Sequence, residues 1–295
     1  MVNIPKVNIG LPVYNGENFI EETLDSILSQ TYADFELIIS DNASTDKTEK
    51  ICNLYAEKDK RIRYHRNKEN LGGSRNYNKA FELSNSEYFK WAAHDDIISP
   101  TFLERCVEVL DQDPSIVLCY SKMQYIDAKG SVLNDYEERP NHASQKTFMR
   151  FSDFVLKGTG TFEHFGLVRS NVLKKITLYE GYSLTDNVIL AELSLQGKFF
   201  EIPEILFFIR SHPEQCTQAI PDRVAQTIWY DTRKKNKLAF PHWKATSGYL
   251  RSVNNASLKY DEKLKCYMVV GKWMKMNNRR LFGDLKVALK KTIRI

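Results

Sequence analysis

The first hundred residues alternate between short apolar runs and longer segments with apolar residues three and four positions apart. Four apolar runs predict buried strands, over residues 7–13, 35–40, 61–65 and 88–93. Three amphipathic segments predict helices, over residues 17–31, from Asp46 onward and over 72–83. This order predicts an α/β fold with a mainly parallel sheet flanked by helices.

Beyond residue 100 the pattern predicts a helix to Leu110, a strand over 116–125 and a late strand over 202–209. Residues 128–160 are rich in turn formers and give no clear element. Helices are expected over 223–237 and 261–275. We place a soft boundary near residue 218. It divides a catalytic region, 1–218, with a donor half (1–125) and an acceptor half (126–218), from a helical basic C-terminal region, 219–295.

Composition and cysteine spacing exclude several classes of protein. The chain has 295 residues, 42% hydrophobic and 27% charged, which is typical of a globular domain. The five cysteines form no CxxC pair, which argues against a zinc ribbon or a disulfide framework and favours a reducing compartment. Since no apolar run approaches the ~20 residues of a membrane span and no secretory signal is recognised, we expect a cytoplasmic protein.

Charge is concentrated at the C-terminal end of the chain. Residues 271–295 contain eight Lys and Arg and one acid, Asp284, so the net charge of this segment is +7. Because the net charge of the whole chain is +5, that of residues 1–270 is −2. A near-neutral body does not resemble a nucleic-acid-binding protein, which would spread basic residues over one face. We therefore expect no nucleic acid partner.

Polar side chains follow the predicted strands at the points where these end. They are Tyr14 and Asn15, then Asp41 and Asn42, then His94, Asp95 and Asp96. Because ligands of parallel sheets bind at the carboxyl ends of the strands, these three clusters should converge on one site.

Two readings are open for each acidic residue of these clusters. Asp95 and Asp96 could hold Mg²⁺ or Mn²⁺ together with substrate phosphates, or could cap the helix that begins at Pro100. Asp41 could accept a hydrogen bond from a pyrimidine N–H or cap the next helix. Gly72 allows close approach of the backbone to phosphate, but a glycine turn before a helix is a weak signal.

The combination of these motifs resembles the donor-binding half of family 2 glycosyltransferases over residues 6–125. The segments that carry the resemblance are VNIGLPVYNGENFIEETLDSILSQTYADFELIISDNASTD and NKENLGGSRNYNKAFELSNSEYFKWAAHDDIISPTFLE. The resemblance implies a GT-A fold, a nucleotide-sugar donor and a saccharide or lipid-linked saccharide acceptor. It implies that Tyr14 lies against the base and Asp41 on its ring N–H. It further assigns to the donor site Pro12, Asn42, Gly72, Arg75, Asn76 and Asp95.

The same resemblance implies a metal site and a catalytic base. Asp95 and Asp96 match the acidic motif that holds Mn²⁺ or Mg²⁺ on the diphosphate, although Ala93 replaces the outer acid of many members. In the later segment IPEILFFIRSHPEQCTQ, Arg210 or His212 would neutralise charge or complete the metal shell. Asp186 occupies the position of the base that takes the proton of the acceptor hydroxyl, although Thr185 precedes it where Glu is usual.

Two alternatives to an inverting glycosyltransferase are considered. A nucleotidyltransferase would normally have basic residues in the first strand–helix turn, whereas PVYNGEN has none. A catalytically silent sugar-nucleotide-binding partner subunit is suggested by Ala93 and Thr185. The Asp41 position favours a UDP or dTDP donor without separating the two, and the family suggests surface polysaccharide or glycolipid assembly.

Basic and apolar residues are interleaved in the C-terminal segment. Such a helix can lie in the headgroup region of an anionic membrane. We expect residues 261–276 to pack on the catalytic domain, burying Tyr267, Met268, Val269 and Val270, and residues 279–295 to contact the inner face of the membrane.

Overall fold

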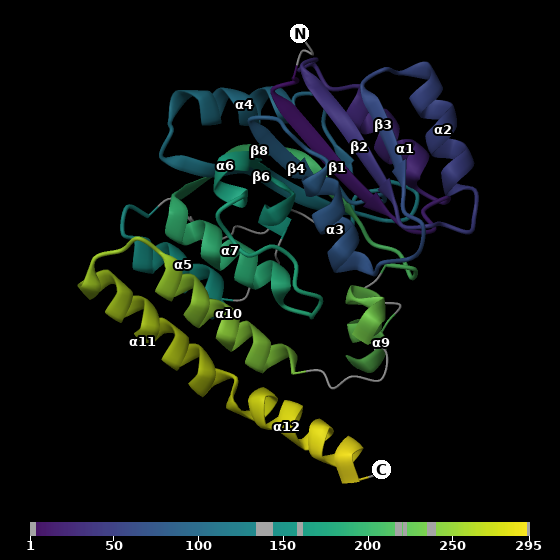
Figure 1. Ribbon diagram of the computed structural model, residues 1–295. Coiled ribbons are helices and arrows are strands. Elements are labelled where there is room, and N and C mark those ends of the chain that lie inside the picture. The colour runs from purple at the N-terminus through teal and green to yellow at the C-terminus, as the bar shows by residue number, and fades with distance from the viewer. Residues whose placement is uncertain are drawn as a thin grey trace.

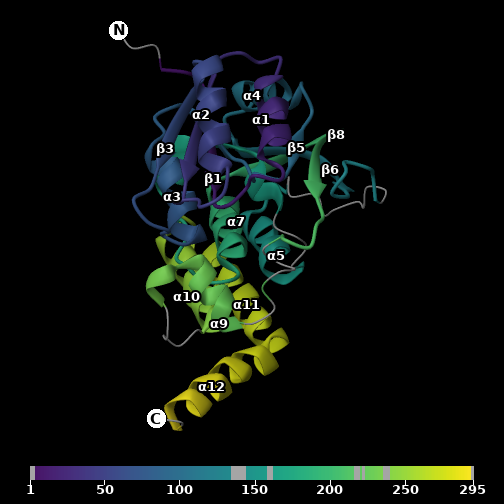
Figure 2. The same cartoon turned by 90° about the vertical axis from the view of Figure 1, so that its right-hand side faces the viewer.

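The computed structural model describes residues 4–133, 144–157, 162–215, 220, 223–234 and 240–293. These residues build one eight-stranded sheet in the order β3-β2-β1-β4-β7-β6-β8-β5. Helices flank the sheet, and the C-terminal helices gather at the end of the molecule opposite the N-terminus (Figures 1 and 2).

The donor half forms the parallel part of the sheet, as the sequence predicted. Its strands, which pair in parallel, are β1 (Val7–Val13), β2 (Phe35–Asp41), β3 (Ile62–Arg66) and β4 (Tyr88–Trp91). The helices between them are α1 (Ile20–Leu28), α2 (Thr48–Lys58) and α3 (Gly73–Glu82). Helix α1 begins three residues later than expected, because the backbone N–H groups of Gly16 and Glu17 bond to the side chains of Thr48 and Asp46.

The elements after β4 make the sheet mixed. Those that begin within the donor half, 1–125, are β5 (Ile97–Ile98), α4 (Phe102–Gln112) and β6 (Ile116–Ile126). Those of the acceptor half, 126–218, are α5 (Thr147–Lys157), η1 (Phe162–Phe165), β7 (Leu167–Arg169), α6 (Ser170–Leu173), α7 (Thr185–Gln196) and β8 (Lys198–Arg210). Strand β7 is antiparallel to β4 and β6, and β5 is antiparallel to β8, whereas β6 and β8 are parallel.

The C-terminal region is helical, as expected. It contains α9 (Arg223–Tyr230), η2 (Thr232–Lys234), α10 (Pro241–Asn255), α11 (Tyr260–Met276) and α12 (Asn278–Ile293). Helix α10 packs on α7 and α11 packs on α5, so this region covers the acceptor half. The boundary expected near residue 218 lies outside the described residues. None of the described helices is long and apolar enough to cross a membrane.

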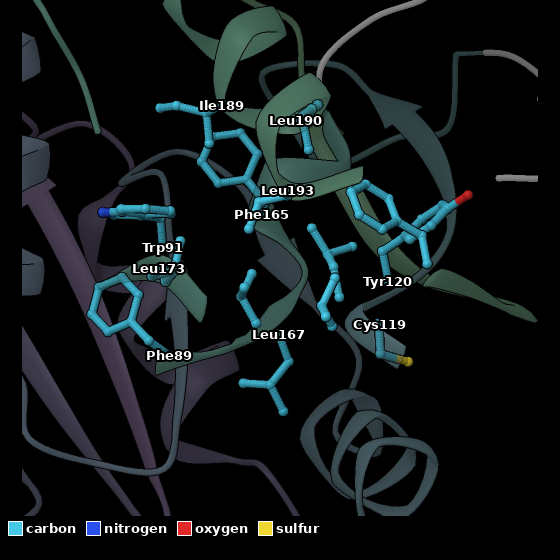
Figure 3. Packing of buried hydrophobic residues seen from close by; sticks show 14 of the residues in the cluster. Phe89, Trp91, Cys119, Tyr120, Phe165, Leu167, Leu173, Ile189, Leu190 and Leu193 are labelled. Carbon is cyan, nitrogen blue, oxygen red and sulfur yellow. The ribbon is translucent and has the colours of Figure 1, made fainter. Parts of the chain in front are cut away.

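A buried cluster ties α7 to the centre of the sheet. Side chains of β4, β6 and β7 meet the inner face of α7 in this cluster, where Trp91 and Leu167 lie near Ile189 and Leu193 (Figure 3). Because α7 carries Asp186 in its first turn, this packing fixes that carboxylate relative to the end of β4.

Candidate active site

The loops that follow β1, β2 and β4 meet at the carboxyl edge of the parallel strands, as the sequence predicted. The Asn15 side chain accepts a hydrogen bond from the Thr45 backbone at 2.8 Å, and the Asn15 N–H donates to Ser44 Oγ at 3.0 Å. A Cβ on Gly16 would lie 2.6 Å from the His94 ring. The three polar clusters therefore form one site.

The acidic motif meets the end of β8 inside this site. Asp95 Oδ2 lies 2.9 Å from His212 Nε2, and both side chains are buried. Although burial alone would raise it, the neighbouring His94 and His212 hold the pKa of Asp95 below its usual range. The Phe19 ring packs against the His212 ring at 4.4 Å between centroids. Asp95 is thus an ionised carboxylate held against an imidazole.

Asp96 has a different environment from its neighbour. Its Oδ1 accepts the Arg210 backbone N–H at 3.0 Å, and its carbonyl oxygen accepts the Thr23 hydroxyl at 2.9 Å. Burial and the charge of Asp95 raise the pKa of Asp96 well above its usual range. Two adjacent carboxyl groups are therefore pushed toward opposite protonation states, a pattern that is typical of functional sites.

Arg210 holds the backbone of Asp95 and the carboxyl group of Asp96 in place. It is 0% exposed, and its Nε donates to the Asp95 carbonyl oxygen at 2.9 Å. Nη1 donates to the carbonyl oxygens of Asp127 and Ala128, and Nη2 lies 2.6 Å from the Glu22 carboxylate. The sequence predicted that Arg210 would neutralise charge or complete the metal shell, whereas these contacts indicate that Arg210 positions Asp95 and Asp96. Of the two candidates, His212 is the one whose side chain contacts a carboxylate of the acidic pair.

A buried lysine supplies positive charge near Asp96. Lys90 donates from Nζ to the Phe165 carbonyl oxygen, and its ammonium lies 4.7 Å from the Phe102 ring centroid and 5.3 Å from that of Phe207. Burial lowers the pKa of Lys90 to about 8, partly opposed by the Asp96 charge. Sequence reasoning missed this residue, because a single lysine in an apolar strand gives no signal of its partner.

The Asp95–His212 pair fits a divalent cation. Adjacent ligands in an octahedron lie about 3.0 Å apart when each is ~2.1 Å from the ion, close to the 2.9 Å between Oδ2 and Nε2. Among the described residues no three His, Cys, Asp or Glu side chains gather into a metal cage. Mg²⁺ and Mn²⁺ commonly take their remaining ligands from phosphates and water, so a two-residue protein contribution suits a diphosphate-bound ion.

Asp41 lies at the expected end of β2 but is fully buried. Its Oδ1 accepts the Ser44 N–H at 2.8 Å, its Oδ2 accepts the Tyr64 hydroxyl at 2.6 Å, and Arg66 lies 3.5 Å away. A carboxylate has about four acceptor positions, so capacity for one more donor remains. A nucleotide base would reach Asp41 only if the loop that carries Ser44 moved outward.

The amides of Asn42 and Asn76 organise the donor-side loops. Asn42 bonds to the Asn70 side chain at 2.9 Å and to the Leu71 N–H at 2.8 Å. Asn76 bonds to the Ser40 hydroxyl and carbonyl oxygen, each at 2.8 Å, and to Asn67 at 2.9 Å. Both residues are buried, so their contacts shape the loops around a ligand.

Tyr14, Pro12 and Arg75 differ in their access to a ligand. Tyr14 is 42% exposed beside the converging loops, as a residue that stacks on a base must be. Pro12 is buried in β1 and pairs with Ser40. Arg75 is half-buried on α3 and lines a surface groove with Lys68 and Lys79.

The glycine turn before α3 contacts the turn around Asp231 in the C-terminal region. Gly72 has φ +84°, and a Cβ there would lie 2.8 Å from the Asp231 Cα atom. Gly181, in the loop before α7, has φ +74° and meets the Asp231 Cβ in the same way. Thr232 Oγ1 donates to the Asn70 carbonyl oxygen, and Lys234 Nζ donates to that of Gly181. One turn therefore joins the donor loop to the loop that precedes Asp186.

Asp186 lies in the first turn of α7, next to Tyr179 and His164. Burial raises the pKa of its carboxyl, whereas His164 and the Tyr179 hydroxyl act in the opposite direction. The Tyr179 ring packs edge-on against Trp91 of β4 at 5.5 Å, which places this group beside the strand that leads to the acidic motif. Nothing in the sequence around Tyr179 signals this partnership.

Backbone strain marks the same loops. Within the described ranges, the non-glycine residues with positive φ are Asn15 after β1, Ala43 after β2 and Leu184 directly before α7. Each such conformation costs of order 1–3 kcal/mol and is found most often at functional sites. Their positions coincide with the three loops that carry the predicted ligand-binding and base residues.

Comparisons with known proteins identify the family of this chain. A family model described as Glycosyl transferase family 2 matches residues 9–177. An uncharacterized glycosyltransferase of Rickettsia typhi is 31% identical over 237 residues, which cover 78% of this chain and 72% of that protein. A counterpart from Rickettsia prowazekii is 31% identical over 241 residues with the same coverage.

Solved structures share the fold. S. aureus TarS 1–349 in complex with UDP-GlcNAc superimposes with a TM-score of 0.67 at 17% identity, covering 92% of this chain and 72% of that one. The mannosyltransferase PcManGT from Pyrobaculum calidifontis, in complex with GDP-Man and Mn²⁺, gives 0.55 at 13% identity, covering 99% and 88%. These likenesses confirm the expected GT-A type of fold.

Proposed function

This chain belongs to glycosyl transferase family 2 and is a glycosyltransferase. We propose that it transfers a sugar from a nucleoside diphosphate to an acceptor hydroxyl and that the transfer inverts the configuration at the anomeric carbon. The observation that carries the proposal is the buried Asp95 carboxylate held against His212 at the edge where three strand-end loops converge. A site of this kind offers an anionic centre for a metal-bound diphosphate and an exposed aromatic ring, Tyr14, for a base.

We propose that the donor carries a pyrimidine, as in UDP or dTDP sugars. The complexes of S. aureus TarS with UDP and UDP-GlcNAc support this for the fold, whereas the Pyrobaculum calidifontis enzyme was solved with GDP-Man. Asp41 would accept the ring N–H of the base after an outward movement of the Ser44 loop. The positive φ of Ala43, between these two residues, marks that loop as a strained segment.

Asp186 is the proposed general base. A single carboxylate that takes the proton of the acceptor hydroxyl, as this attacks the anomeric carbon, is what an inverting displacement needs. The raised pKa of Asp186 suits the role, because a base is more effective when its pKa lies closer to the working pH. Packing of α7 on the sheet core holds its backbone still while the proton moves (Figure 3).

Asp95 and His212 would hold Mn²⁺ or Mg²⁺, with Asp96 beside them. A bound ion would offset the negative charge that develops on the leaving diphosphate. The chain itself contributes the orientation of the ligands: Arg210 fixes the Asp95 carbonyl and the Asp96 carboxyl, and Phe19 packs on His212. Loss of contacts that orient a metal ligand typically lowers metal affinity or activity by about 10–100-fold.

We propose a saccharide or lipid-linked saccharide as acceptor, used in assembly of a surface polysaccharide or glycolipid. The location proposed is the cytoplasm, with peripheral attachment to the inner face of the membrane. The basic C-terminal helices support that attachment.

A catalytically silent binder is the second candidate, favoured by Ala93 and Thr185 where many members carry acids. Release of nucleoside diphosphate from a panel of UDP, dTDP and GDP sugars separates the two. We expect release from a pyrimidine donor in Mn²⁺ and at least about tenfold slower release in EDTA. Binding of these donors without any release would favour the silent subunit.

A further inference from the structure

Helices α11 and α12 each carry a stripe of exposed apolar side chains, which the described part of the chain leaves uncovered. On α11 they are Tyr260, Leu264, Tyr267 and Met268. On α12 they are Phe282, Leu285 and Leu289. Residues spaced by three and four positions share one face of a helix, so each set forms a continuous stripe. We call these residues, with the basic side chains beside them, the α11–α12 face.

The opposite sides of both helices are packed on the protein. Helix α11 buries Cys266, Val269, Val270 and Trp273. Helix α12 buries Leu281, whose carbonyl oxygen accepts a hydrogen bond from Trp243 Nε1 at 3.1 Å. The expectation that Tyr267 and Met268 would be buried is therefore wrong, because Cys266 and Trp273 occupy the inward positions of that turn. The apolar stripes are presented outward by helices that are already fixed in place.

Charge on the α11–α12 face is of one sign over α12. The exposed charged side chains of its described part are Arg279, Arg280 and Lys286. The acid of this segment, Asp284, is only 1% exposed, and its carboxylate accepts the His242 N–H at 2.9 Å and lies 3.2 Å from His242 Nδ1. Packing thus hides the carboxylate and leaves the cations outside. Lys272 and Lys275 extend the positive charge along α11.

We propose that the α11–α12 face is a docking surface for an anionic membrane. Apolar side chains on such a helix enter the headgroup boundary while Lys and Arg contact lipid phosphates. Among the described residues of α12 the exposed cations have no exposed acid beside them, which complements the phosphates of an anionic lipid surface. The face lies at the end of the molecule away from the N-terminus (Figures 1 and 2).

This inference deepens the proposed peripheral location, and it differs from the sequence-based expectation. That expectation assigned packing to 261–276 and membrane contact to 279–295, whereas each helix has one packed and one exposed apolar side. Truncation at residue 278 would remove the contacts of Leu281 and Asp284 with α10 as well as the exposed stripe. Point variants of exposed residues are therefore the sharper test.

Three double variants, each with an apolar and a basic residue four positions apart on one helix, form a matched set. Met268→Ser with Lys272→Gln tests α11, and Phe282→Ser with Lys286→Gln tests α12. Met268 is 67% exposed and Phe282 is 63% exposed, so neither change disturbs the core. The control is Leu54→Ser with Lys50→Gln on α2, where Leu54 is 45% exposed.

The measurement is co-sedimentation of the full chain with vesicles of phosphatidylcholine, with and without phosphatidylglycerol, at ~0.15 M salt. We expect binding only to the anionic vesicles, a loss of at least about fivefold in partition for the α11 and α12 variants, and no loss for the control. Equal partition of all variants, or no binding by the unaltered chain, would overturn the proposal. So would a dimer that the α11 or α12 changes dissociate, since the face would then be a protein interface. Release of nucleoside diphosphate in solution, measured on the same variants, tests the donor chemistry separately.

Discussion

His212 Nε2 lies 2.9 Å from Asp95 Oδ2, a contact between residues 117 positions apart. It joins the segment after β4 to the segment after β8, so a histidine that is distant in the sequence contacts the acidic motif. The neighbouring His94 and His212 keep the pKa of the Asp95 carboxyl below its usual range, so an anionic oxygen lies beside the imidazole where a cation would bind.

His212→Ala should raise the Mn²⁺ concentration needed for donor binding by about 10–100-fold, because one of two protein ligands is lost. The measurement is calorimetric titration of the sugar nucleotide at a series of Mn²⁺ concentrations. His65→Ala, a histidine of β3, is the matched control and should leave the Mn²⁺ requirement unchanged. Equal donor affinity of the unaltered protein in EDTA and in Mn²⁺ would remove the metal role from Asp95 and His212.

Asp186→Asn should lower kcat by about 10²–10⁴-fold while leaving donor affinity nearly unchanged, since a general base acts on the acceptor and not on the nucleotide. Initial rates of nucleoside diphosphate release with acceptor, and titration of the donor, give the two quantities. Asn187→Asp, one position along α7, is not expected to restore turnover when combined with it. Full turnover by Asp186→Asn would assign the proton transfer to another group.

The same substitution should affect stability in a pH-dependent manner. Burial raises the pKa of Asp186 in the folded protein above the value of about 3.9 in the unfolded chain. The protonated carboxyl therefore contributes fully to the free energy of unfolding below about pH 3.9, and this contribution is lost as the pH rises through the folded pKa. Asp186→Asn removes a half-buried charge, and its Tm should exceed that of the unaltered protein at about pH 7.5, with a difference that shrinks toward about pH 4. A Tm difference that does not vary with pH would contradict this assignment.

Gly72→Ala should destabilise the protein through a clash with the Asp231 backbone, in addition to the cost of φ +84°. Gly130 has nearly the same φ, +83°, but no atom within 4 Å of its built Cβ. Gly130→Ala should cost about 1–2 kcal/mol from backbone strain. Gly72→Ala should cost about 1–3 kcal/mol more, because Gly72 also has ψ 158°, a combination that almost only glycine adopts, and because of the Asp231 contact. Urea unfolding of both variants checks the difference. Equal losses would mean that the Asp231 turn does not press on the donor loop.

The sequence predicted the parallel half of the sheet well because each strand there is a continuous buried run, as in Val7–Val13. It also predicted that Asp95, Asp41 and Tyr14 lie at one edge, since that follows from parallel topology alone. What it could not predict is which of them face a ligand. Tyr64 occupies one oxygen of Asp41 and backbone carbonyls bind the Arg210 guanidinium, contacts that depend on tertiary packing.

Helix α10 was missed for a related reason. Its buried face alternates small residues, Ala245, Gly248 and Ser252, with Tyr249 and Val253, so the apolar stripe in the sequence is weak. A Cβ on Gly248 would lie 2.8 Å from a methyl group of Val188, so these small residues let α10 approach α7 closely. Small-residue packing between helices is therefore the feature that hydrophobic periodicity does not detect here.

The most direct test of the central claim measures donor binding and sugar transfer in one preparation of the full chain. Titration with UDP and dTDP sugars in Mn²⁺ gives the affinity, and release of nucleoside diphosphate in the presence of a saccharide acceptor gives the turnover. We predict that the unaltered protein and Asp186→Asn bind the same pyrimidine donor equally, and that only the unaltered protein turns it over at an appreciable rate. Binding by both proteins with turnover by neither, across the donor and acceptor panel, would contradict the claim that this site catalyses transfer.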